Sequence, residues 1–465
     1  MDTTVILDPV DQLAMEMRGV LIRPGDPGYD DARMVRNGLI DRHPAVIARC
    51  HGTADVVAAV NYAREHGLLL SIRGGGHNVA GNAVNDGGIV IDLSEMRAVF
   101  VDPDRRRARA QGGATWGDFD RETQQFGLAT TGGAVSSTGI AGLTLHGGLG
   151  YLHRAFGLAL DNLRSVEIVT ADGQVRTASE TENPDLFWAI RGAGSNFGVV
   201  TSFEFEVYPI PQELYSAVPL FTMDDAPAIL RKYRDFAESA PDDFAPAVIF
   251  WSVPAIPDFP EELHGTPIVV IQIAYTGDPA EGEELLKPVF EWGTPLVDLS
   301  GSAPYVAMQN GFDAFFPAGW FYYWKSLLLQ SATDDVIDTL CEVAAARPSP
   351  QSILNFWQLG GAISRVPADA TAYVRRDAGH MLSLDTTWTD PRDTDRCIAW
   401  ARQTWSTLQE KFGLGGAYLN FAGFGEEKEA LVRASYGQNY ARLAEIKRRY
   451  DPDNLFRMNN NIKPA

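Results

Sequence analysis

A glycine segment that ends in a histidine separates two apolar stretches early in the chain. Residues 71–93 read SIRGGGHNVAGNAVNDGGIVIDL, and the flanking LLLSI (68–72) and GIVIDL (88–93) predict buried strands. Three consecutive glycines allow positive φ and bring backbone N–H groups close to a ligand, as in nests that bind phosphate oxygens. The segment therefore predicts either a plain turn or a phosphate-binding loop, with the positive charge of Arg73 beside it.

Two common nucleotide-binding loops do not match this sequence. No Gly-Lys-Ser/Thr follows the glycines, as a P-loop requires, and GAGSNFG (192–198) follows a predicted helix and has the wrong glycine spacing for a Rossmann fingerprint. A lone histidine such as His77 is often a hydrogen-bonding core residue, and the eight histidines show no HExxH or comparable pair. We therefore expect no metal site.

The acidic balance of the chain argues against polyanionic partners. Sixty acidic and 39 basic side chains give a net charge of −21, so the surface lacks the cations that nucleic acids and anionic membranes need. The start, MDTTVILDPVDQL, has neither a basic nor an apolar leader region, and no run of eighteen apolar residues occurs. We expect a cytoplasmic protein with no nucleic-acid or membrane partner; its oligomeric state is not predicted.

The pattern of elements changes near the prolines at 209 and 211. Residues 1–208 alternate strands, glycine-rich loops and helices, as in a mixed α/β unit. In residues 209–415, strands such as HMLSLDTTW alternate with long helices, which predicts an α+β unit. Residues 416–465 contain a helix, an Asp-Pro stop and an asparagine-rich segment. The predicted fold class is α+β, with two domains and a C-terminal segment.

Four motifs occur in an order that is typical of one family. They are RGGGHN, GLGYLHRAFGLALDNLRSVEIVTADG, NPDLFWAIRGAGSNFGVVT and YDPDNLF. The chain thereby resembles the FAD-linked oxidases of the berberine bridge enzyme type, within the vanillyl-alcohol oxidase superfamily, which carry a PCMH-type FAD-binding domain. The resemblance implies an N-terminal FAD-binding domain, to which the C-terminal segment returns, and a substrate domain of antiparallel sheet covered by helices.

The resemblance also implies that FAD is bonded covalently to His77. In the family, the histidine of the GGGH segment is joined to the 8α-methyl group of the flavin. Many relatives carry a second link from a cysteine, but Val135 stands at the matching position here, so we expect a single bond. Three residues further on, Thr138 occupies the position that governs access of O₂ to the ring. Its small side chain favours an oxidase or an oxygenase over a dehydrogenase.

Further cofactor contacts follow from the matched motifs. A glycine loop lets backbone approach the pyrophosphate, and the tail asparagines are expected either to reach the flavin or to act as caps. The expected cofactor-binding residues, besides His77 and Thr138, are Arg73, Gly74, Gly75, Gly76, Asn78, Gly139, Gly142, Gly150, Gly198, Val199, Asn459 and Asn461.

Flavin oxidation of a C–H bond needs a base that takes a proton from O–H or N–H. The family frequently places this base in a YxN motif, which reads AYLNFAG here, so Tyr418 is the first candidate and Asn420 its orienting partner. Phe421 replaces the second aromatic hydroxyl that many relatives have. A tyrosine base needs a nearby cation or donor, for which Arg375 or Lys325 is expected.

Asp385 is the second candidate for the base. The period of two in HMLSLDTTW places it on one face of a strand with Ser383. The alternative is an aspartate that faces water at a strand edge. Tyr151, Gln358 and Tyr323 are expected to face the substrate, the last within the aromatic run FFPAGWFYYWKS (315–326).

The predicted function is oxidation of a small alcohol, amine, or phenolic or polyketide-like metabolite with O₂ as the electron acceptor. One alternative is a monooxygenase of secondary metabolism that inserts oxygen from an oxygenated flavin. Another is an oligosaccharide oxidase, because sugars also stack on aromatic rings. A flavin-binding protein without catalytic activity is the alternative outside enzymology.

Overall fold

The computed structural model describes residues 8–425 and 429–465. Their strands form sheets of four, five, two and nine strands, packed with helices into a mixed α+β fold. The first two sheets use strands between Val20 and Glu206, and the nine-stranded sheet uses strands between Glu213 and Trp388. The domain boundaries after residues 208 and 415 remain a prediction.

The four-stranded sheet carries the glycine segment. Its order is β1-β2-β4-β3, with β1 at Val20–Ile22, β2 at Val46–Arg49, β4 at Ile89–Asp92 and β3 at Leu70–Arg73. Strands β2, β4 and β3 are parallel, and α3 (Thr53–Glu65) connects β2 to β3 and packs in one apolar cluster with them. The short helices α1 (Pro9–Glu16) and α2 (Tyr29–Arg33) complete this part. The glycines follow the end of β3, as the sequence predicted.

The five-stranded sheet is antiparallel throughout. Its order is β5 (Val99–Asp102), β6 (Arg107–Gln111), β10 (Val199–Glu206), β8 (Leu163–Val169) and β9 (Val175–Ser179). The Asp172–Gly173 turn joins β8 and β9, and Gly173 has the positive φ that such a turn requires. Helices α4 (Trp116–Thr123), α5 (Ile140–Leu145) and α7 (Pro184–Ala193) share the apolar cluster of this sheet, whereas α6 (His153–Phe156) packs against the strand Phe244–Ser252. Strand β7 (Leu128–Ala129) pairs with β11 (Tyr208–Pro209).

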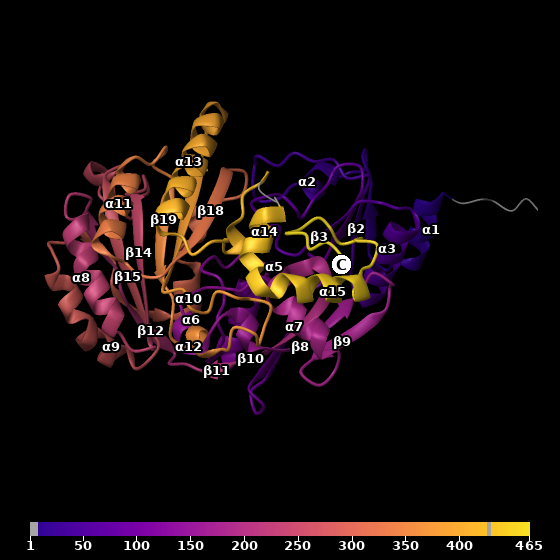
Figure 1. Cartoon of the computed structure of the whole chain (residues 1–465), viewed down its shortest axis with the longest axis horizontal. Helices are drawn as coiled ribbons and strands as arrows, with labels where there is room; N and C mark the ends of the chain where they lie inside the picture. Colours follow the sequence, from indigo (N-terminus) through magenta and orange to yellow (C-terminus); the bar gives the residue numbers. More distant parts are fainter. Residues whose placement is uncertain (1–7, 426–428) are drawn as a thin grey trace, which may run out of the picture.

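The nine-stranded sheet is also antiparallel. Its main order is β16 (Val297–Asp298), β13 (Pro219–Thr222), β15 (Pro267–Tyr275), β14 (Phe244–Ser252), β19 (Ile353–Gln358), β20 (His380–Trp388) and β18 (Phe321–Leu329). Strand β12 (Glu213–Ala217) lies off this path and pairs with β15 and with β17 (Gly301–Pro304). Its helices are α8 (Ala226–Ser239), α9 (Pro279–Leu286), α10 (Tyr305–Asn310), α11 (Asp334–Ala345), α12 (Ala362–Arg365) and α13 (Thr394–Phe412). Figure 1 shows α8, α9 and α11 along one side of the sheet, with α13 rising beyond it.

Alternation along these strands gives the sheet two different faces. Val248, Leu327 and Leu384 point to the helices and share their apolar cluster. Residues of opposite parity, such as Trp324 and Asp385, point to the other side, which we call the cavity face. The cavity face is directed toward the glycine segment.

The C-terminal segment packs against the N-terminal half of the chain. Helices α14 (Glu429–Tyr436) and α15 (Tyr440–Tyr450) share an apolar cluster with α7 and β10, and Figure 1 shows them in yellow beside α5 and α7. Lys447 of α15 is fully buried and donates hydrogen bonds of 2.6 Å to the Asp451 carboxylate, 2.6 Å to the Asn196 carbonyl and 2.8 Å to the Phe456 carbonyl. These bonds fix the start of the asparagine-rich tail.

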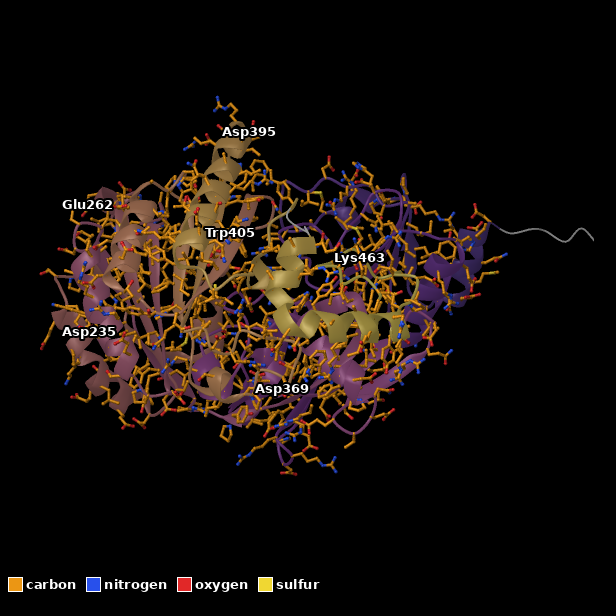
Figure 2. The ribbon with its side chains drawn as sticks, viewed as in Figure 1. Asp235, Glu262, Asp369, Asp395, Trp405 and Lys463 are labelled. Atoms are coloured by element: carbon orange, nitrogen blue, oxygen red, sulfur yellow. The ribbon has the colours of Figure 1, made fainter. Side chains whose placement is uncertain are left out.

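Acidic side chains extend outward around the molecule. Figure 2 shows Asp235, Glu262 and Asp395 at its outer edge, and all three are exposed. In residues 8–425 and 429–465 no helix combines the length and apolar character that crossing a membrane requires.

Candidate active site

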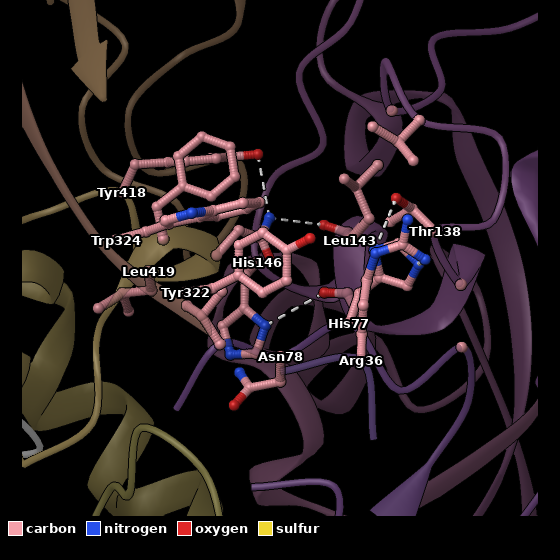
Figure 3. Close-up of a pocket in the computed structure, with 18 of the residues that line it drawn as sticks. Arg36, His77, Asn78, Thr138, Leu143, His146, Tyr322, Trp324, Tyr418 and Leu419 are labelled. Carbon is pink, nitrogen blue, oxygen red and sulfur yellow. Dashed lines mark hydrogen bonds between the residues drawn. The ribbon is translucent and has the colours of Figure 1, made fainter. Parts of the chain in front are cut away.

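A cavity of about 250 Å³ lies between the glycine segment, residues 133–149, the cavity face of the nine-stranded sheet and the asparagine-rich tail. Figure 3 shows Tyr418 and Trp324 on one side of it, and His77, Thr138 and Arg36 on the other. The cavity therefore brings together residues that are more than 300 positions apart in the chain.

The glycine segment lies directly against a second loop. A Cβ atom on Gly75 would be 2.4 Å from the Gly139 backbone nitrogen, and Gly76 has a φ of +69°. Only glycine allows the two backbones to come this close, so steric contact with the second loop explains why glycine is needed at Gly75. On the cavity side, a Cβ atom on Gly142 would meet nothing within 4 Å.

His77 faces the cavity within a small polar cluster. Its Nε2 atom lies 3.2 Å from Nη1 of Arg36 and 3.1 Å from Oγ of Ser137, and its Nδ1 atom lies 3.4 Å from Oγ1 of Thr138. Burial, assisted by the positive charge of Arg36, lowers the pKa of His77 to about 3. The imidazole is therefore neutral near pH 7, which is the form that can act as a nucleophile.

The Arg73 side chain does not reach this cavity. Its guanidinium group is buried in an ion pair with Asp92 at 2.7 Å and donates to the Ala32 and Met34 carbonyls. These partners take four of the five N–H donors of the guanidinium group, so the predicted phosphate contact of the Arg73 side chain is corrected to a structural ion pair.

The remaining expected cofactor residues fall into two groups. Those that line the cavity are His77, Gly74, Gly75, Gly76, Asn78, Thr138, Gly139, Gly142 and Asn459, and Val135 lines it as well. Those outside its lining are Gly150, Gly198, Val199 and Asn461. Gly150 instead lies against the Gly132 carbonyl, Gly198 lies against the Val169 carbonyl, and Val199 is fully buried in the core. Their glycine or apolar character serves packing.

The three expected substrate residues also lie outside the lining. Tyr323 points toward α13, because β18 turns Tyr322 and Trp324 to the cavity face instead. Gln358 donates to the Ala237 carbonyl, and Tyr151 is buried beside Trp357. The aromatic run 315–326 does contribute to the cavity, but through Phe316, Tyr322 and Trp324.

Asp385 lies on the cavity face with only 3% of its surface exposed. Asn355 donates a hydrogen bond of 2.7 Å to Oδ2, whereas Oδ1 has no partner among the described residues. Burial raises the pKa of Asp385 to about 7, since a charged carboxylate loses its hydration there. The alternative, an aspartate that faces water at a strand edge, is therefore wrong, because this carboxyl group is buried.

Tyr418 contributes its hydroxyl group to the opposite end of the lining. Its oxygen accepts hydrogen bonds from the backbone N–H groups of Gly148 at 2.9 Å and Leu149 at 3.1 Å, and from Nδ2 of Asn420 at 3.0 Å. Burial raises the pKa of Tyr418, although these three donors oppose that effect. The contact between Tyr418 and Asn420 is the one that the YxN motif suggested.

The donors to Tyr418 differ from the cations that the sequence suggested. Lys325 lies on the helix side of β18, with its Nζ 3.9 Å from the ring centre of Trp405. Arg375 is not among the donors to the Tyr418 oxygen described above. Phe421 packs edge-on against both Tyr418 and Trp324.

Several lining residues carry no signal in the sequence. Arg36 and His146 belong to no motif, and Asn355 and Trp357 could be assigned to the cavity only if the covered face of β19 were known. Asn459 and Asn461 were expected at the cavity, but the two asparagines of the tail that line it are Asn459 and Asn460. Strand periodicity would have grouped Asn355 with Trp357, but it would not have said which face they share.

The lining fits a flavin. Glycines form one wall without side chains, as a flat ring system or a pyrophosphate group requires. Two buried polar atoms, Nε2 of His146 and Oδ1 of Asn459, have no partner among the described residues and suit the polar edge of such a ring. Metal ligation has less support, because in the part of the chain that the structure describes no three His, Cys, Asp or Glu side chains are grouped to hold an ion.

Comparison with known proteins identifies the family. Residues 44–179 match the sequence model of the FAD binding domain, and residues 417–463 match that of the berberine and berberine-like region. The chain is 31% identical to (R)-6-hydroxynicotine oxidase of Paenarthrobacter nicotinovorans over 97% of this chain and 98% of that protein. It is 30% identical to chitooligosaccharide oxidase of Gibberella zeae over 95% and 91%, respectively.

A solved structure shows the same fold. The crystal structure of 6-hydroxy-D-nicotine oxidase from Arthrobacter nicotinovorans matches with a TM-score of 0.84 at 30% identity, covering 97% of this chain and 98% of that one. The fold and the recognition predicted from the four motifs are confirmed. The chain belongs to the FAD-linked oxidases of the vanillyl-alcohol oxidase superfamily, and it is an FAD-dependent oxidoreductase.

Proposed function

We propose that the protein is an oxidase with FAD bonded to His77 by a single covalent link, and that it transfers electrons from a small alcohol, amine or phenolic metabolite to O₂. The observation that carries this proposal is the shared cavity of His77 and Asp385. A nucleophile for the flavin, in the loop after β3, and a proton acceptor for the substrate, in β20, face the same cavity. When bound, FAD supplies the hydride acceptor and the route of electrons to O₂.

The anchor assignment rests on the chemistry of His77. A neutral imidazole beside a loop without side chains can approach the methyl edge of a flavin closely. Val135, which lines the same cavity, has no sulfur to form a second link. Small side chains at Val135 and Thr138 leave space for O₂ on this side, which supports an oxidase.

Asp385 is the better candidate for the base. Three N–H donors favour the phenolate form of Tyr418, but burial outweighs them and raises its pKa, so the hydroxyl group is neutral near pH 7. Asp385 lines the cavity, and its pKa of about 7 suits proton uptake near neutral pH.

The other described residues around the cavity recognise and position the substrate. Aromatic residues contribute to its lining, and they are Phe312, Phe316, Tyr322, Trp324, Trp357 and Phe421. Such residues favour a flat, largely apolar substrate. Asp385 would accept its proton, and the buried indole N–H of Trp324 is a donor that has no partner among the described residues. Asn355 positions the Asp385 carboxyl group.

Oligosaccharide oxidation is the second candidate function. Xylooligosaccharide oxidase and chitooligosaccharide oxidase are both similar to this chain over more than nine-tenths of its length. Sugar rings also stack on indole faces, which Trp324 and Trp357 provide. A monooxygenase reaction has the same requirements for His77 and Thr138, and the origin of the product oxygen separates it from an oxidase.

The test combines two measurements on the purified flavoprotein. Acid precipitation followed by peptide mass analysis should leave the flavin mass on the His77 peptide, and His77→Ala should release the flavin. Anaerobic mixing with panels of aromatic amines, aromatic alcohols and oligosaccharides should bleach the flavin with one class. A colourless pellet would refute the covalent link, no bleaching with any class would refute the oxidase, and label from ¹⁸O₂ in the product would indicate a monooxygenase.

A further inference from the structure

A turn beside His77 is bonded to a distant segment of the chain by a carboxylate. We call residues 133–138 the flavin-side turn and residues 305–316, between β17 and β18, the substrate-side segment. The Asp313 carboxylate accepts a hydrogen bond of 2.8 Å from the Ser136 N–H group through Oδ1, and another from the Ser136 hydroxyl group through Oδ2. Two charge-assisted hydrogen bonds to one residue fix its orientation as well as its position.

The flavin-side turn carries cavity residues on both sides of Ser136. The Thr138 N–H group donates to the Val135 carbonyl at 3.1 Å, which makes Ser136 and Ser137 the central residues of a β-turn. Val135 and Thr138 line the cavity, and the Ser137 hydroxyl lies 3.1 Å from Nε2 of His77. Fixing Ser136 therefore fixes the wall of the cavity beside His77.

The substrate-side segment presents aromatic rings to the same cavity. Phe312 and Phe316, which precede and follow Asp313 in the sequence, both line it. The two rings and Val135 pack in one apolar cluster. The Asp313 carboxylate thus connects the part of the cavity that we assign to the substrate with the part that we assign to the flavin.

Two further contacts hold the segment and the turn together. Nε2 of Gln309 donates a hydrogen bond of 3.0 Å to the Gly133 carbonyl, and this contact is buried. Arg36 donates to Oγ of Ser137 at 3.0 Å and also to the Phe316 carbonyl. The flavin-side turn is therefore bonded to the substrate-side segment at three places, twice directly and once through Arg36.

The Asp313 carboxylate does not serve its own helix. Asp313 is the first residue of the 3₁₀ helix Asp313–Phe315, where an acidic side chain commonly bonds to backbone N–H groups of the same turn. Among the described residues, both hydrogen bonds of this carboxylate go instead to Ser136, which is 177 positions earlier in the chain. The contact between the two segments is what this side chain provides.

We propose that Asp313 is a positioning residue that holds the aromatic side of the cavity at a fixed distance from the flavin side, and so aligns a bound substrate for hydride transfer. This inference rests on the function proposed above. In that reaction a C–H bond of the substrate breaks, its hydride passes to the flavin and its O–H or N–H proton to Asp385. O₂ then takes up the two electrons with two protons as H₂O₂, so atoms and electrons balance.

Loss of the carboxylate should affect alignment more than binding. Without it, Ser136 is released from the substrate-side segment, but Phe312 and Phe316 remain on that segment and can still contact the substrate. The substrate then keeps most of its binding contacts and loses its fixed distance to the flavin. A displacement of about 1 Å can slow a reaction about 10²-fold.

The experiment compares the wild-type holoprotein with Asp313→Ala. The probe is the compound from the panels of aromatic amines, aromatic alcohols and oligosaccharides that bleaches the flavin. Anaerobic stopped-flow mixing gives the limiting rate of flavin reduction and the Kd of this compound, and visible circular dichroism reports how the flavin is held without it. In Asp313→Ala the limiting rate should fall at least tenfold, the Kd should change less than threefold, and the visible spectrum should change in shape.

Matched variants separate alignment from general stability. Asp298 accepts hydrogen bonds from the N–H and hydroxyl groups of Ser300, but it lies in β16 and does not line the cavity, so Asp298→Ala should change none of the three quantities. Asp313→Asn keeps one acceptor oxygen and Ser136→Ala removes one of two donors, so each should lose part of the limiting rate. If Asp313→Ala fails to fold, these two partial variants provide the test.

The outcomes distinguish this inference from the proposed function. A wild-type protein that no compound bleaches would overturn both. A wild-type limiting rate in Asp313→Ala, an equal loss in Asp298→Ala, or a Kd that rises tenfold would overturn the inference and leave the oxidase intact. A lower melting temperature with an unchanged rate and spectrum would likewise reduce Asp313 to a structural role.

Discussion

Asn355 donates a hydrogen bond of 2.7 Å to Oδ2 of Asp385, while Oδ1 of the same carboxyl group has no partner among the described residues. The two residues come from the adjacent strands β19 and β20, and both point to the cavity face. Asn355 therefore holds one oxygen of a carboxyl group that lines the cavity. This pair provides the most direct tests of the proposed chemistry.

Replacing Asp385 should slow flavin reduction strongly. Asp385→Asn keeps the shape and the neighbour Asn355 but removes the proton acceptor, so the rate of reduction under anaerobic conditions should fall by roughly 10²- to 10⁴-fold. Asp377→Asn, at an exposed position before β20, is the matched control and should leave the rate unchanged. A decrease of less than threefold for Asp385→Asn would exclude it as the base.

Flavin reduction should depend on pH through Asp385. Only the ionised carboxylate accepts a proton, so the rate should increase with pH through a midpoint near its pKa of about 7 and then level off. The Asn355 donor favours the ionised form, so Asn355→Leu should move the midpoint to higher pH. Stopped-flow rates between pH 5 and 9 measure both, and an unchanged midpoint in Asn355→Leu would contradict the assignment.

The Asp385 carboxyl group should make the protein less stable as pH rises, although it makes flavin reduction faster. Its folded pKa of about 7 exceeds the usual value of 3.8, so between these pH values the folded state binds more protons than the unfolded state. The contribution of this group to the free energy of unfolding is therefore greatest at low pH. It decreases as pH rises toward 7, by up to about 1.4 kcal/mol per pH unit. Melting temperatures of Asp385→Asn should decrease less between pH 5 and 7.5 than those of the wild type, and equal decreases would argue against the raised pKa.

Removing the Tyr418 hydroxyl should affect stability more than chemistry. Tyr418→Phe leaves the N–H groups of Gly148 and Leu149 without their acceptor, which should cost about 1–3 kcal/mol of folding free energy. Tyr436→Phe is the control, since that buried hydroxyl has no partner among the described residues. Flavin reduction in Tyr418→Phe should slow less than in Asp385→Asn, and a greater loss would return the base to Tyr418.

Local patterns carried much of the prediction. The glycine segment, the Asp-Gly hairpin between β8 and β9 and the strand that holds Asp385 depend on backbone preferences and on alternation, which operate within a few residues. The resemblance to the family implied, through the YxN motif, that Asn420 contacts Tyr418, and Nδ2 of Asn420 donates to the Tyr418 oxygen. These features need no knowledge of the rest of the chain.

The errors arose where a distant partner decides the outcome. Tyr323 was expected at the cavity, but α13 covers its face of β18 and turns Tyr322 and Trp324 inward. Arg73 was expected to meet phosphate, but the Asp92 carboxylate at the end of the neighbouring strand takes up its charge. Periodicity states which residues share a face, and only packing states what that face meets.

The sequence by itself determined the family, the α+β fold class and the glycine loop with its histidine, because these follow from motifs and from short-range backbone chemistry. Only the tertiary structure brought Arg36 to His77 and gave Asp385 its buried position on the cavity face. The reason is physical: hydrogen-bond partners, burial and the resulting pKa values depend on segments that are adjacent in space and far apart in the chain.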